Sequence, residues 1–231
     1  MSSPNPWLME HGDMQQAQPK PYPIALTQLA GVRCVVVGGG EVALRKVRAL
    51  LQSGAHVCVV SPALHPLLTE WRAAGQIEHW ARPYAPDDLA GAFLAIAATD
   101  RREVNAAVAA EARQRDILCN IADDPDGSSF HTLATVTRGS VLLAATTGGE
   151  SPALAAHIRR KLEQTFGPEY GILAERMGRL RAEVGQSLVP AARAQLWRAL
   201  ATDDVLEMVR NNDLAGLERL IETLIAELKQ P

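Results

Sequence analysis

A chain of 231 residues is long enough to bury a core in one large domain or in two modest ones. The 23 Lys and Arg residues against 26 Asp and Glu residues give a formal net charge of −3 with interspersed signs, which argues against a nucleic-acid partner. No apolar run approaches the roughly 18–20 residues that a membrane span needs, so no membrane partner is expected.

The N-terminal segment, MSSPNPWLMEHGDMQQAQPK, lacks the basic region followed by an apolar region that marks a secretory signal. Pro, Gln and small polar residues predominate in it, so residues 1–21 are predicted to form a mobile tail. Cys34, Cys58 and Cys119 each lie inside an apolar run and are expected to be buried free thiols, not disulfide or zinc ligands. These features predict a cytoplasmic protein.

Residues 22–122 alternate short apolar runs with longer amphipathic ones. Strands are predicted at 32–37, 57–60, 77–80, 93–98 and 117–121, and helices at 41–53, 63–74 and 101–115. Strands separated by helix-length segments imply right-handed crossovers and a parallel sheet with helices on both faces. The sequence therefore predicts an α/β fold built on a doubly wound parallel sheet.

The pattern changes after residue 122. Residues 123–150 are rich in β-formers, with strands predicted at 131–137 and 141–146 and a hairpin turn at 138–140. Residues 151–231 are predicted to be helical, with helices at 151–165, 169–184, 190–200, 203–211 and 214–229. A small α+β segment and a helical tail are too thin to bury their own apolar faces well. We therefore expect a second copy to cover them, which makes a homodimer.

The first predicted strand runs into a glycine triplet, in the sequence VVVGGGEVA. Gly38, Gly40 and Ala43 fit the GxGxxA form of the dinucleotide fingerprint, which follows a strand and opens a helix in Rossmann-type domains. Gly38 permits the tight turn, Gly40 the close approach of a pyrophosphate, and Ala43 close packing of helix on strand. The alternative is a glycine-rich turn with no ligand, but the context favours a nucleotide.

The second predicted strand ends without the acidic residue that usually binds the ribose of NAD. Ser61 stands at that position, followed by Pro62. A serine can hydrogen-bond a ribose hydroxyl, but it neither repels nor captures a 2′-phosphate. Since no Arg follows Ser61 directly, NAD is expected as the cofactor in preference to NADP.

Polar residues follow the later strands, at the sheet edge where ligands bind in this fold class. Thr99 and Asp100 follow the fourth strand, and Asn120, Asp123 and Asp124 lie at the end of the fifth. A carboxylate there would take up the proton released when a hydride leaves the substrate. For Asp123 and Asp124 the alternative is an ordinary Asx turn before Pro125 and Gly127. Asp100 is expected to cap the helix at 101–115, with Glu103 as its capping-box partner.

Basic residues gather near the same end of the sheet, among them Arg45 and Lys46 on the first helix. They are either a solvated helix face or a site that recognises several carboxylates of one substrate. His131 is the histidine nearest the polar residues in sequence, and the histidines show no metal-ligand spacing, so no protein-held metal is expected.

Four ordered blocks carry a closer likeness: VVVGGGEVALRKVRALLQSGAHVCVVSP, LAIAATDRREVNAAVA, LCNIADDP and TTGGESPALAAHIRRKLE. They resemble the precorrin-2 dehydrogenase / sirohydrochlorin ferrochelatase family, which is the N-terminal module of bacterial siroheme synthase and also occurs as a free-standing protein. The resemblance covers roughly residues 22–185, and four blocks in order are far more specific than the glycine fingerprint alone.

The resemblance implies NAD-dependent oxidation of precorrin-2 to sirohydrochlorin in siroheme biosynthesis. In many members insertion of ferrous iron follows, a lyase activity that makes Fe²⁺ a second substrate. It also implies a homodimer. The key carboxylate of the family corresponds to Asp123, which favours Asp123 over Asp124 as the base. One base then serves both steps, because dehydrogenation and metal insertion each release protons.

Further site residues are expected around Asp123. The residues expected to bind the cofactor are Gly38, Gly39, Gly40, Glu41, Val42, Ser61 and Pro62, with Thr99, Asp100 and Asn120 near the nicotinamide. The residues expected to contact the polyanionic tetrapyrrole are Arg45, Lys46, His131, Thr147 and Ser151.

The chain departs from the family at two positions. Leu133 stands where the family's SF-x-x-P stretch has proline, and Thr147 stands where some members have serine before the GG-x-SP turn. No methyltransferase domain follows, so methylation is expected to come from another protein.

Two other functions compete with the leading one. A non-catalytic NAD-sensing regulatory module would normally keep the acidic ribose residue that Ser61 replaces. A dehydrogenase for a simpler acid would need a His–Asp or Lys–Asp pair, and no such pair is evident.

Overall fold

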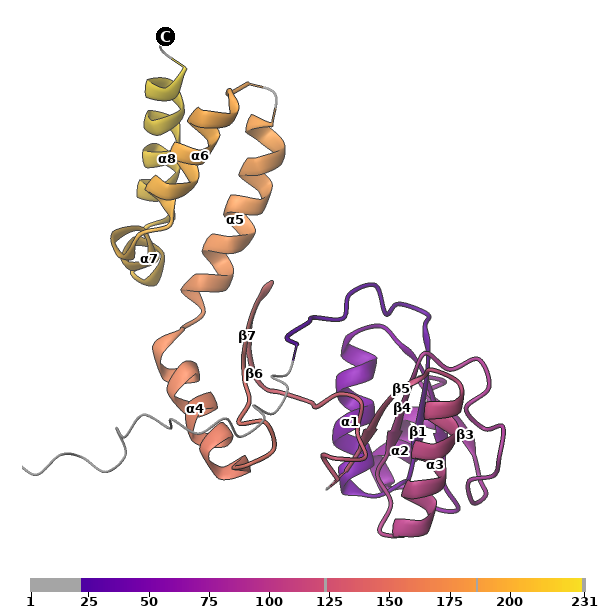
Figure 1. The fold of residues 1–231 in the computed structure, drawn as a ribbon. Helices are drawn as coiled ribbons and strands as arrows, with labels where there is room; N and C mark the ends of the chain where they lie inside the picture. The colour runs from indigo at the N-terminus through magenta and orange to yellow at the C-terminus, as the bar shows by residue number, and fades with distance from the viewer. Residues whose placement is uncertain (1–21, 123, 186, 230–231) are drawn as a thin grey trace, which may run out of the picture. The chain divides into compact units, whose positions relative to one another are not determined.

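The computed structural model describes residues 22–122, 124–185 and 187–229 (Figure 1). The chain divides into two compact units, Met1–Leu94 and Ala95–Pro231. The predicted tail at 1–21 and the predicted base Asp123 lie outside the described residues. The division into segments 1–21, 22–122, 123–150 and 151–231 stays a prediction.

A five-stranded parallel sheet with the strand order β3-β2-β1-β4-β5 confirms the predicted α/β, Rossmann-type fold (Figure 1). Its strands are β1 Arg33–Val37, β2 His56–Val60, β3 Glu78–Trp80, β4 Leu94–Ala97 and β5 Leu118–Ile121. β1 and β2 pair in parallel from Arg33 opposite His56 to Val37 opposite Val60. All four residues of β4 are buried, as its unbroken apolar sequence predicts for a central strand.

Three helices flank the sheet: α1 Glu41–Gln52, α2 Pro66–Ala73 and α3 Arg102–Gln114. α1 ends at Gln52, one residue before the predicted end, and Gly54 beyond its C-cap adopts a φ of +75°. α2 begins at Pro66, three residues later than predicted. His65 is its N-cap and accepts a hydrogen bond from the Leu67 N–H, and proline is favoured in the position that follows a cap.

The predicted hairpin consists of β6 Ala134–Arg138 and β7 Val141–Ala145, which form a separate two-stranded antiparallel sheet. Arg138 pairs with Val141, so the turn is Gly139–Ser140, one residue shorter than predicted. The first strand begins at Ala134 and not at 131, because the preceding segment is bonded to β5: Ser129 exchanges hydrogen bonds with the Cys119 backbone.

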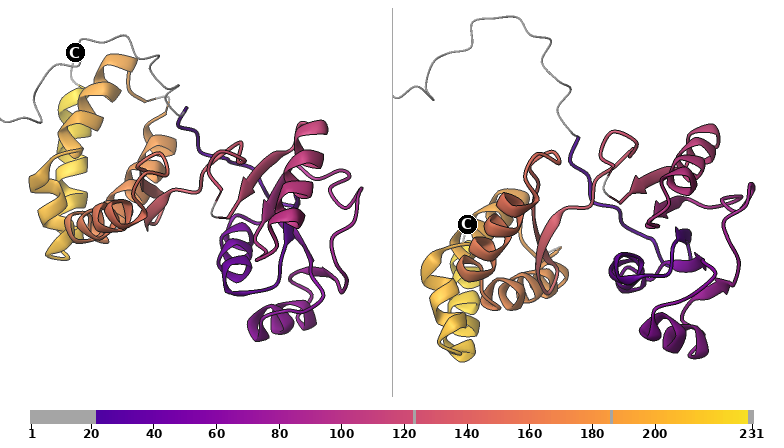
Figure 2. Two further views of the ribbon diagram at one scale, coloured as in Figure 1. Left: turned by 60° about the horizontal axis from the view of Figure 1, so that its bottom comes forward. Right: turned by 90° about the horizontal axis from the view of Figure 1, so that it is seen from below.

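The helices that follow the hairpin are α4 Pro152–Thr165, α5 Glu169–Val184, α6 Pro190–Leu200, α7 Asp203–Arg210 and α8 Leu214–Leu228. Figure 2 shows α5–α8 from two further directions. Their buried apolar residues form one cluster: Leu173, Leu180, Val184, Leu188, Ala192, Leu196, Leu200, Val205, Leu206, Val209, Leu217 and Ile221. The expectation that the whole helical segment is too thin for a core is therefore wrong for α5–α8.

α4 and the hairpin do fit the expectation of a segment too thin to bury its own apolar faces. α4 contacts both β6 and β7 but has no buried residue, and Val136 is the buried residue of the hairpin. Arg138 ties the hairpin to the end of α4 by donating to the Phe166 and Glu163 carbonyl oxygens at 2.9 and 3.0 Å. This part of the second unit is held by few buried apolar contacts.

The three cysteines are buried free thiols, as predicted. Burial raises the pKa of Cys34, Cys58 and Cys119 to about 11, so each is a neutral thiol at ordinary pH. Over the described residues, no helix combines the length and the hydropathy of a membrane span.

Candidate functional site

The turn between β1 and α1 is built as a site for an anion. Gly38 has a φ of +122°, which favours glycine, and its N–H donates to the Val60 oxygen at 2.9 Å. Gly40 is the N-cap of α1 in an extended conformation, and no side chain of the described residues caps this helix. A Cβ added to Gly40 would meet nothing within 4 Å. The first N–H groups of α1 therefore have no side-chain acceptor, and the turn at Gly40 is uncrowded, which fits a dinucleotide diphosphate.

Gly39 serves a different purpose from its neighbours. A Cβ added to it would lie 1.9 Å from the Ala63 oxygen and 2.7 Å from Ser61 Oγ. The Gly39 oxygen accepts a hydrogen bond from the His65 N–H at 2.6 Å. Gly39 thus allows the loop between β2 and α2 to pack against the glycine turn.

Ser61 is buried at the end of β2, where it replaces the usual acidic residue. Its hydroxyl donates to the Ala63 oxygen at 2.7 Å, so its proton is used inside the loop and its lone pairs are left for a ligand. The Ser61 carbonyl oxygen accepts from His79 Nε2 at 2.9 Å. Pro62, also predicted to bind the cofactor, is exposed beside it.

A contact that the sequence analysis missed joins the two loops. Glu41, the first residue of α1, lies with Oε2 at 3.3 Å from His65 Nε2. Because His65 Nδ1 accepts from the Leu67 N–H, a neutral His65 carries its ring proton on Nε2, the nitrogen that contacts Glu41. Pro66 is a local signal for the first position of a helix, but no local signal shows that His65 contacts Glu41. Val42 is partly buried behind Glu41.

Thr99, not Asp100, organises the chain between β4 and α3. Thr99 Oγ1 donates to Asn105 Oδ1 at 2.7 Å and accepts from the Arg101 N–H at 3.2 Å, and Asn105 returns a bond to the Thr99 oxygen at 3.0 Å. The N-cap of α3 is Arg101, without a side-chain cap, and Glu103 pairs with Arg101 at 2.8 Å. The predicted capping box of Asp100 and Glu103 is therefore wrong, and Asp100 is exposed.

The loop after β5 is fixed by short polar side chains. Asn120 is buried and its Nδ2 donates to the Phe130 oxygen at 3.0 Å. Asp124 Oδ1 accepts from the Gly127 N–H at 3.0 Å, which is the Asx turn weighed for this segment. Ser128 Oγ accepts from the Ile121 N–H at 2.8 Å and donates to the Asp124 oxygen at 2.8 Å.

The loop after β5 also meets the turn before α4. A Cβ added to Gly149 would lie 3.3 Å from Pro125 Cγ and 4.0 Å from His131 Cε1, and His131 Nε2 is 3.4 Å from the Pro125 oxygen. Thr147 Oγ1 accepts from the Ser151 N–H at 3.0 Å, and Ser151 caps α4 by accepting from the Leu154 N–H. His131 is thus placed beside this turn, whose shape Thr147 and Ser151 hold.

Arg45 and Lys46 lie on α1, where Arg45 is exposed and Lys46 is partly buried. Across the part of the chain that the structure describes, no group of three or more His, Cys, Asp or Glu side chains lies close enough together to hold a metal ion.

Two family models match the chain. The first is described as putative NAD(P)-binding and matches residues 25–134, and the second is the sirohaem synthase dimerisation region and matches residues 169–225. The first match includes the glycine turn, the Ser61 loop and the segments after β4 and β5. With the open N-terminus of α1, it confirms the expected nicotinamide dinucleotide cofactor.

Curated relatives are siroheme synthases. The chain is 42% identical over 195 residues to siroheme synthase 1 of Aeromonas salmonicida, which covers 84% of this chain and 42% of the relative. It is 41% identical over 207 residues to siroheme synthase of Chromobacterium violaceum, covering 89% of this chain and 44% of the relative. The chain therefore spans less than half the length of these relatives.

Among solved structures, the chain is similar to SirC, precorrin-2 dehydrogenase. The TM-score is 0.75 at 26% sequence identity, and the match covers 88% of this chain and 100% of that one. Both family models, the relatives and this structure agree with the four sequence blocks. The chain is therefore recognised as a relative of siroheme synthases and of precorrin-2 dehydrogenase.

Proposed function

We propose that this chain oxidises precorrin-2 to sirohydrochlorin in siroheme biosynthesis, with NAD⁺ as the hydride acceptor. The observation that carries the proposal is the similarity to a precorrin-2 dehydrogenase over the whole of that protein's length, at a TM-score of 0.75. The open glycine turn supports it independently, because it offers helix N–H groups to a diphosphate.

The nicotinamide half is proposed to lie by Thr99, Asp100 and Asn120. These residues follow or end β4 and β5, and ligands of open parallel sheets bind beyond the carboxyl ends of the strands. The hydrogen bonds of Thr99 with Asn105, and of Asn120 with Phe130, support a rigid floor for the reacting ring. The dinucleotide, when bound, supplies the acceptor for the hydride.

Asp123 is proposed as the base that takes the proton released with the hydride. Asp124 closes an Asx turn with Gly127, so the neighbouring carboxylate has a structural task. The Ala122 N–H donates to the Ala97 oxygen at 2.8 Å, which extends the pairing with β4 up to the residue before Asp123.

Asp123→Asn tests this role, since the amide cannot accept a proton. We expect the variant to lose at least about a hundredfold in turnover, the usual contribution of a general base, and to bind NAD⁺ nearly as well as the wild type. NADH formation with precorrin-2 under anaerobic conditions measures turnover, and titration calorimetry measures binding.

Asp124→Asn is the matched control. Its side-chain oxygen can still accept from the Gly127 N–H, so turnover is expected to stay close to that of the wild type. Full activity of Asp123→Asn would remove Asp123 from the mechanism. A wild-type chain that binds NAD⁺ but forms no NADH would favour the rival function, a non-catalytic NAD-sensing module.

Recognition of the tetrapyrrole carboxylates is proposed for Arg45, Lys46, His131, Thr147 and Ser151. The turn before α4 supports this for the last three, because His131 and Gly149 of that turn both lie close to Pro125. Arg45 supports it through its exposed guanidinium.

Ferrous iron is proposed as a second substrate, inserted into sirohydrochlorin with release of two pyrrolic protons, for which Asp123 would again be the base. The proposal treats the iron as bound by the macrocycle. Formation of siroheme from sirohydrochlorin and Fe²⁺ by the wild-type chain tests it.

A homodimer is proposed as the working form. The match of residues 169–225 to a dimerisation region supports it, as do the sparsely buried hairpin and α4. The cytoplasmic location stays a prediction.

A further inference from the structure

The site lacks an obvious device for choosing between NAD⁺ and NADP⁺. These cofactors differ by a phosphate on the 2′-oxygen of the adenine ribose, which an acidic residue at the end of the second strand normally excludes. Ser61 occupies that place and is neutral, and its hydroxyl proton is donated to the Ala63 oxygen. Its remaining capacity is to accept hydrogen bonds, which does not discriminate by charge.

A carboxylate reaches this loop from the other side. Glu41 opens α1, and its Oε2 lies 3.3 Å from Nε2 of His65, which caps α2. Glu41 directly follows the glycine turn, and the His65 N–H donates to the Gly39 oxygen within that turn. This contact places the Glu41 carboxylate beside the N-cap of α2, and 69% of the Glu41 side chain is exposed.

We propose that Glu41, positioned by His65, replaces the missing acidic residue and selects NAD⁺ against NADP⁺. This inference rests on the proposed function, since it concerns the same dinucleotide site. A carboxylate accepts a hydrogen bond from a free ribose hydroxyl and repels a 2′-phosphate. The segment SPALHP, residues 61–66, contains no Lys or Arg that would compensate the phosphate.

Glu41→Gln is the direct test, because the amide keeps the size and the accepting oxygen but removes the charge. Dissociation constants of NAD⁺ and of NADP⁺ are measured by titration calorimetry on the whole chain. We expect the NADP⁺/NAD⁺ ratio of the dissociation constants to fall at least tenfold relative to the wild type.

Glu70→Gln is the matched control, since it removes the same charge from an exposed position on α2. The NADP⁺/NAD⁺ ratio of the dissociation constants in Glu70→Gln is expected to equal that of the wild type. An unchanged ratio in Glu41→Gln, or an equal fall in Glu70→Gln, overturns the proposal.

His65→Asn tests the positioning role, because asparagine is a good helix N-cap but is too short to reach Glu41. We expect the NADP⁺/NAD⁺ ratio of the dissociation constants in His65→Asn to lie between those of the wild type and Glu41→Gln. A ratio equal to that of the wild type overturns the positioning role of His65. Failure of the wild-type chain to bind NAD⁺ would remove the proposed function together with this inference. Binding with an unchanged ratio in Glu41→Gln removes this inference alone.

Discussion

Gly39 and Gly40 are neighbours in the turn after β1, yet their surroundings differ. The α-carbon of Gly39 faces the backbone of the loop between β2 and α2, where a Cβ would lie 1.9 Å from the Ala63 oxygen. A Cβ added to Gly40 would meet nothing within 4 Å, and Gly40 is the N-cap of α1, a helix without a side-chain cap. We therefore expect Gly39 to be needed for folding and Gly40 for ligand binding.

Alanine substitutions should separate these two roles. Gly39→Ala is expected to destabilise the fold by at least about 1–3 kcal/mol, the usual cost of overpacking, because backbone must move to admit the methyl group. Gly40→Ala is expected to cost no more than about 1 kcal/mol, a helix-cap effect, and to weaken NAD⁺ binding at least tenfold. Urea denaturation and calorimetry measure the two quantities. A stable Gly39→Ala, or a Gly40→Ala that binds NAD⁺ normally, would contradict this division.

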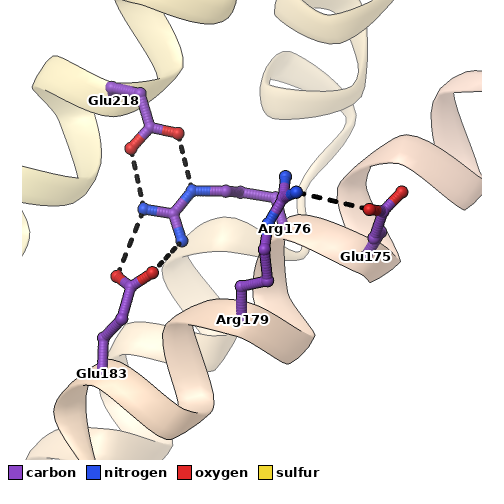
Figure 3. A network of polar contacts seen from close by, with 5 residues as sticks. All are labelled: Glu175, Arg176, Arg179, Glu183 and Glu218. Carbon is purple, nitrogen blue, oxygen red and sulfur yellow. Dashed lines mark hydrogen bonds and ion pairs between the residues drawn. The ribbon is translucent and has the colours of Figure 1, made fainter.

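At the scale of elements, α5 is tied to α8 by one arginine. Arg176 donates to Glu218 through Nε and Nη2 at 2.6 and 2.7 Å, and it also contacts Glu183 at 3.1 Å (Figure 3). Arg179 stands one turn of the same helix away and pairs with Glu175 at 3.3 Å, with both side chains largely exposed. The first arrangement is bidentate and links two helices, and the second is a surface pair within one helix.

Arg176→Met should therefore cost more stability than Arg179→Met. We expect a loss of about 1–2 kcal/mol for Arg176→Met and of at most about 0.5 kcal/mol for Arg179→Met, measured by urea denaturation at neutral pH. Hydrogen bonds from Arg176 lower the pKa of Glu218, so the pairing stabilises above the usual glutamate pKa and is lost as pH falls through the lowered one. The difference between the variants should therefore shrink in acid. Equal losses of stability in the two variants at neutral pH would contradict the larger contribution that we assign to Arg176.

The sequence predicts elements well where local signals end them. α5 and α6 have the predicted bounds, since Pro168, Gly185 and Pro190 punctuate them. The start of α3 is predicted wrongly, because side chains six residues apart, Thr99 and Asn105, satisfy each other and leave Asp100 outside the cap.

In the candidate site, too, local features can be predicted from the sequence and contacts between distant residues cannot. The glycine turn follows from residue types whose backbone needs are local, so its anion-binding helix end is predictable. The packing of Gly39 on Ala63 and the pair of Glu41 with His65 depend on two loops more than 20 residues apart, and no local pattern encodes which side chains meet.

At the scale of the whole molecule, the hairpin is the part least able to stand alone. The residues of β6 and β7 alternate between a partly buried face and an exposed one, and the exposed face carries Thr135, Thr137, Leu142 and Ala144. Its two strands pair only with each other among the described residues, so both outer edges are unpaired. Isolated two-stranded sheets are marginal in water, and open edges invite another strand.

A second copy is the partner that we propose for this surface. Leu142 is 54% exposed on the outer face of β7, so placing a charge there should oppose its burial between protomers. We expect Leu142→Asp to shift the chain from dimer towards monomer, measured by light scattering after size-exclusion chromatography. Ile24→Asp, which charges an aliphatic residue of similar exposure (59%) in the first unit, is the control and should remain dimeric. A wild-type monomer, or a Leu142→Asp dimer as tight as the wild type, would show that this face is not the interface. In that outcome the sparse packing of the hairpin would need another explanation.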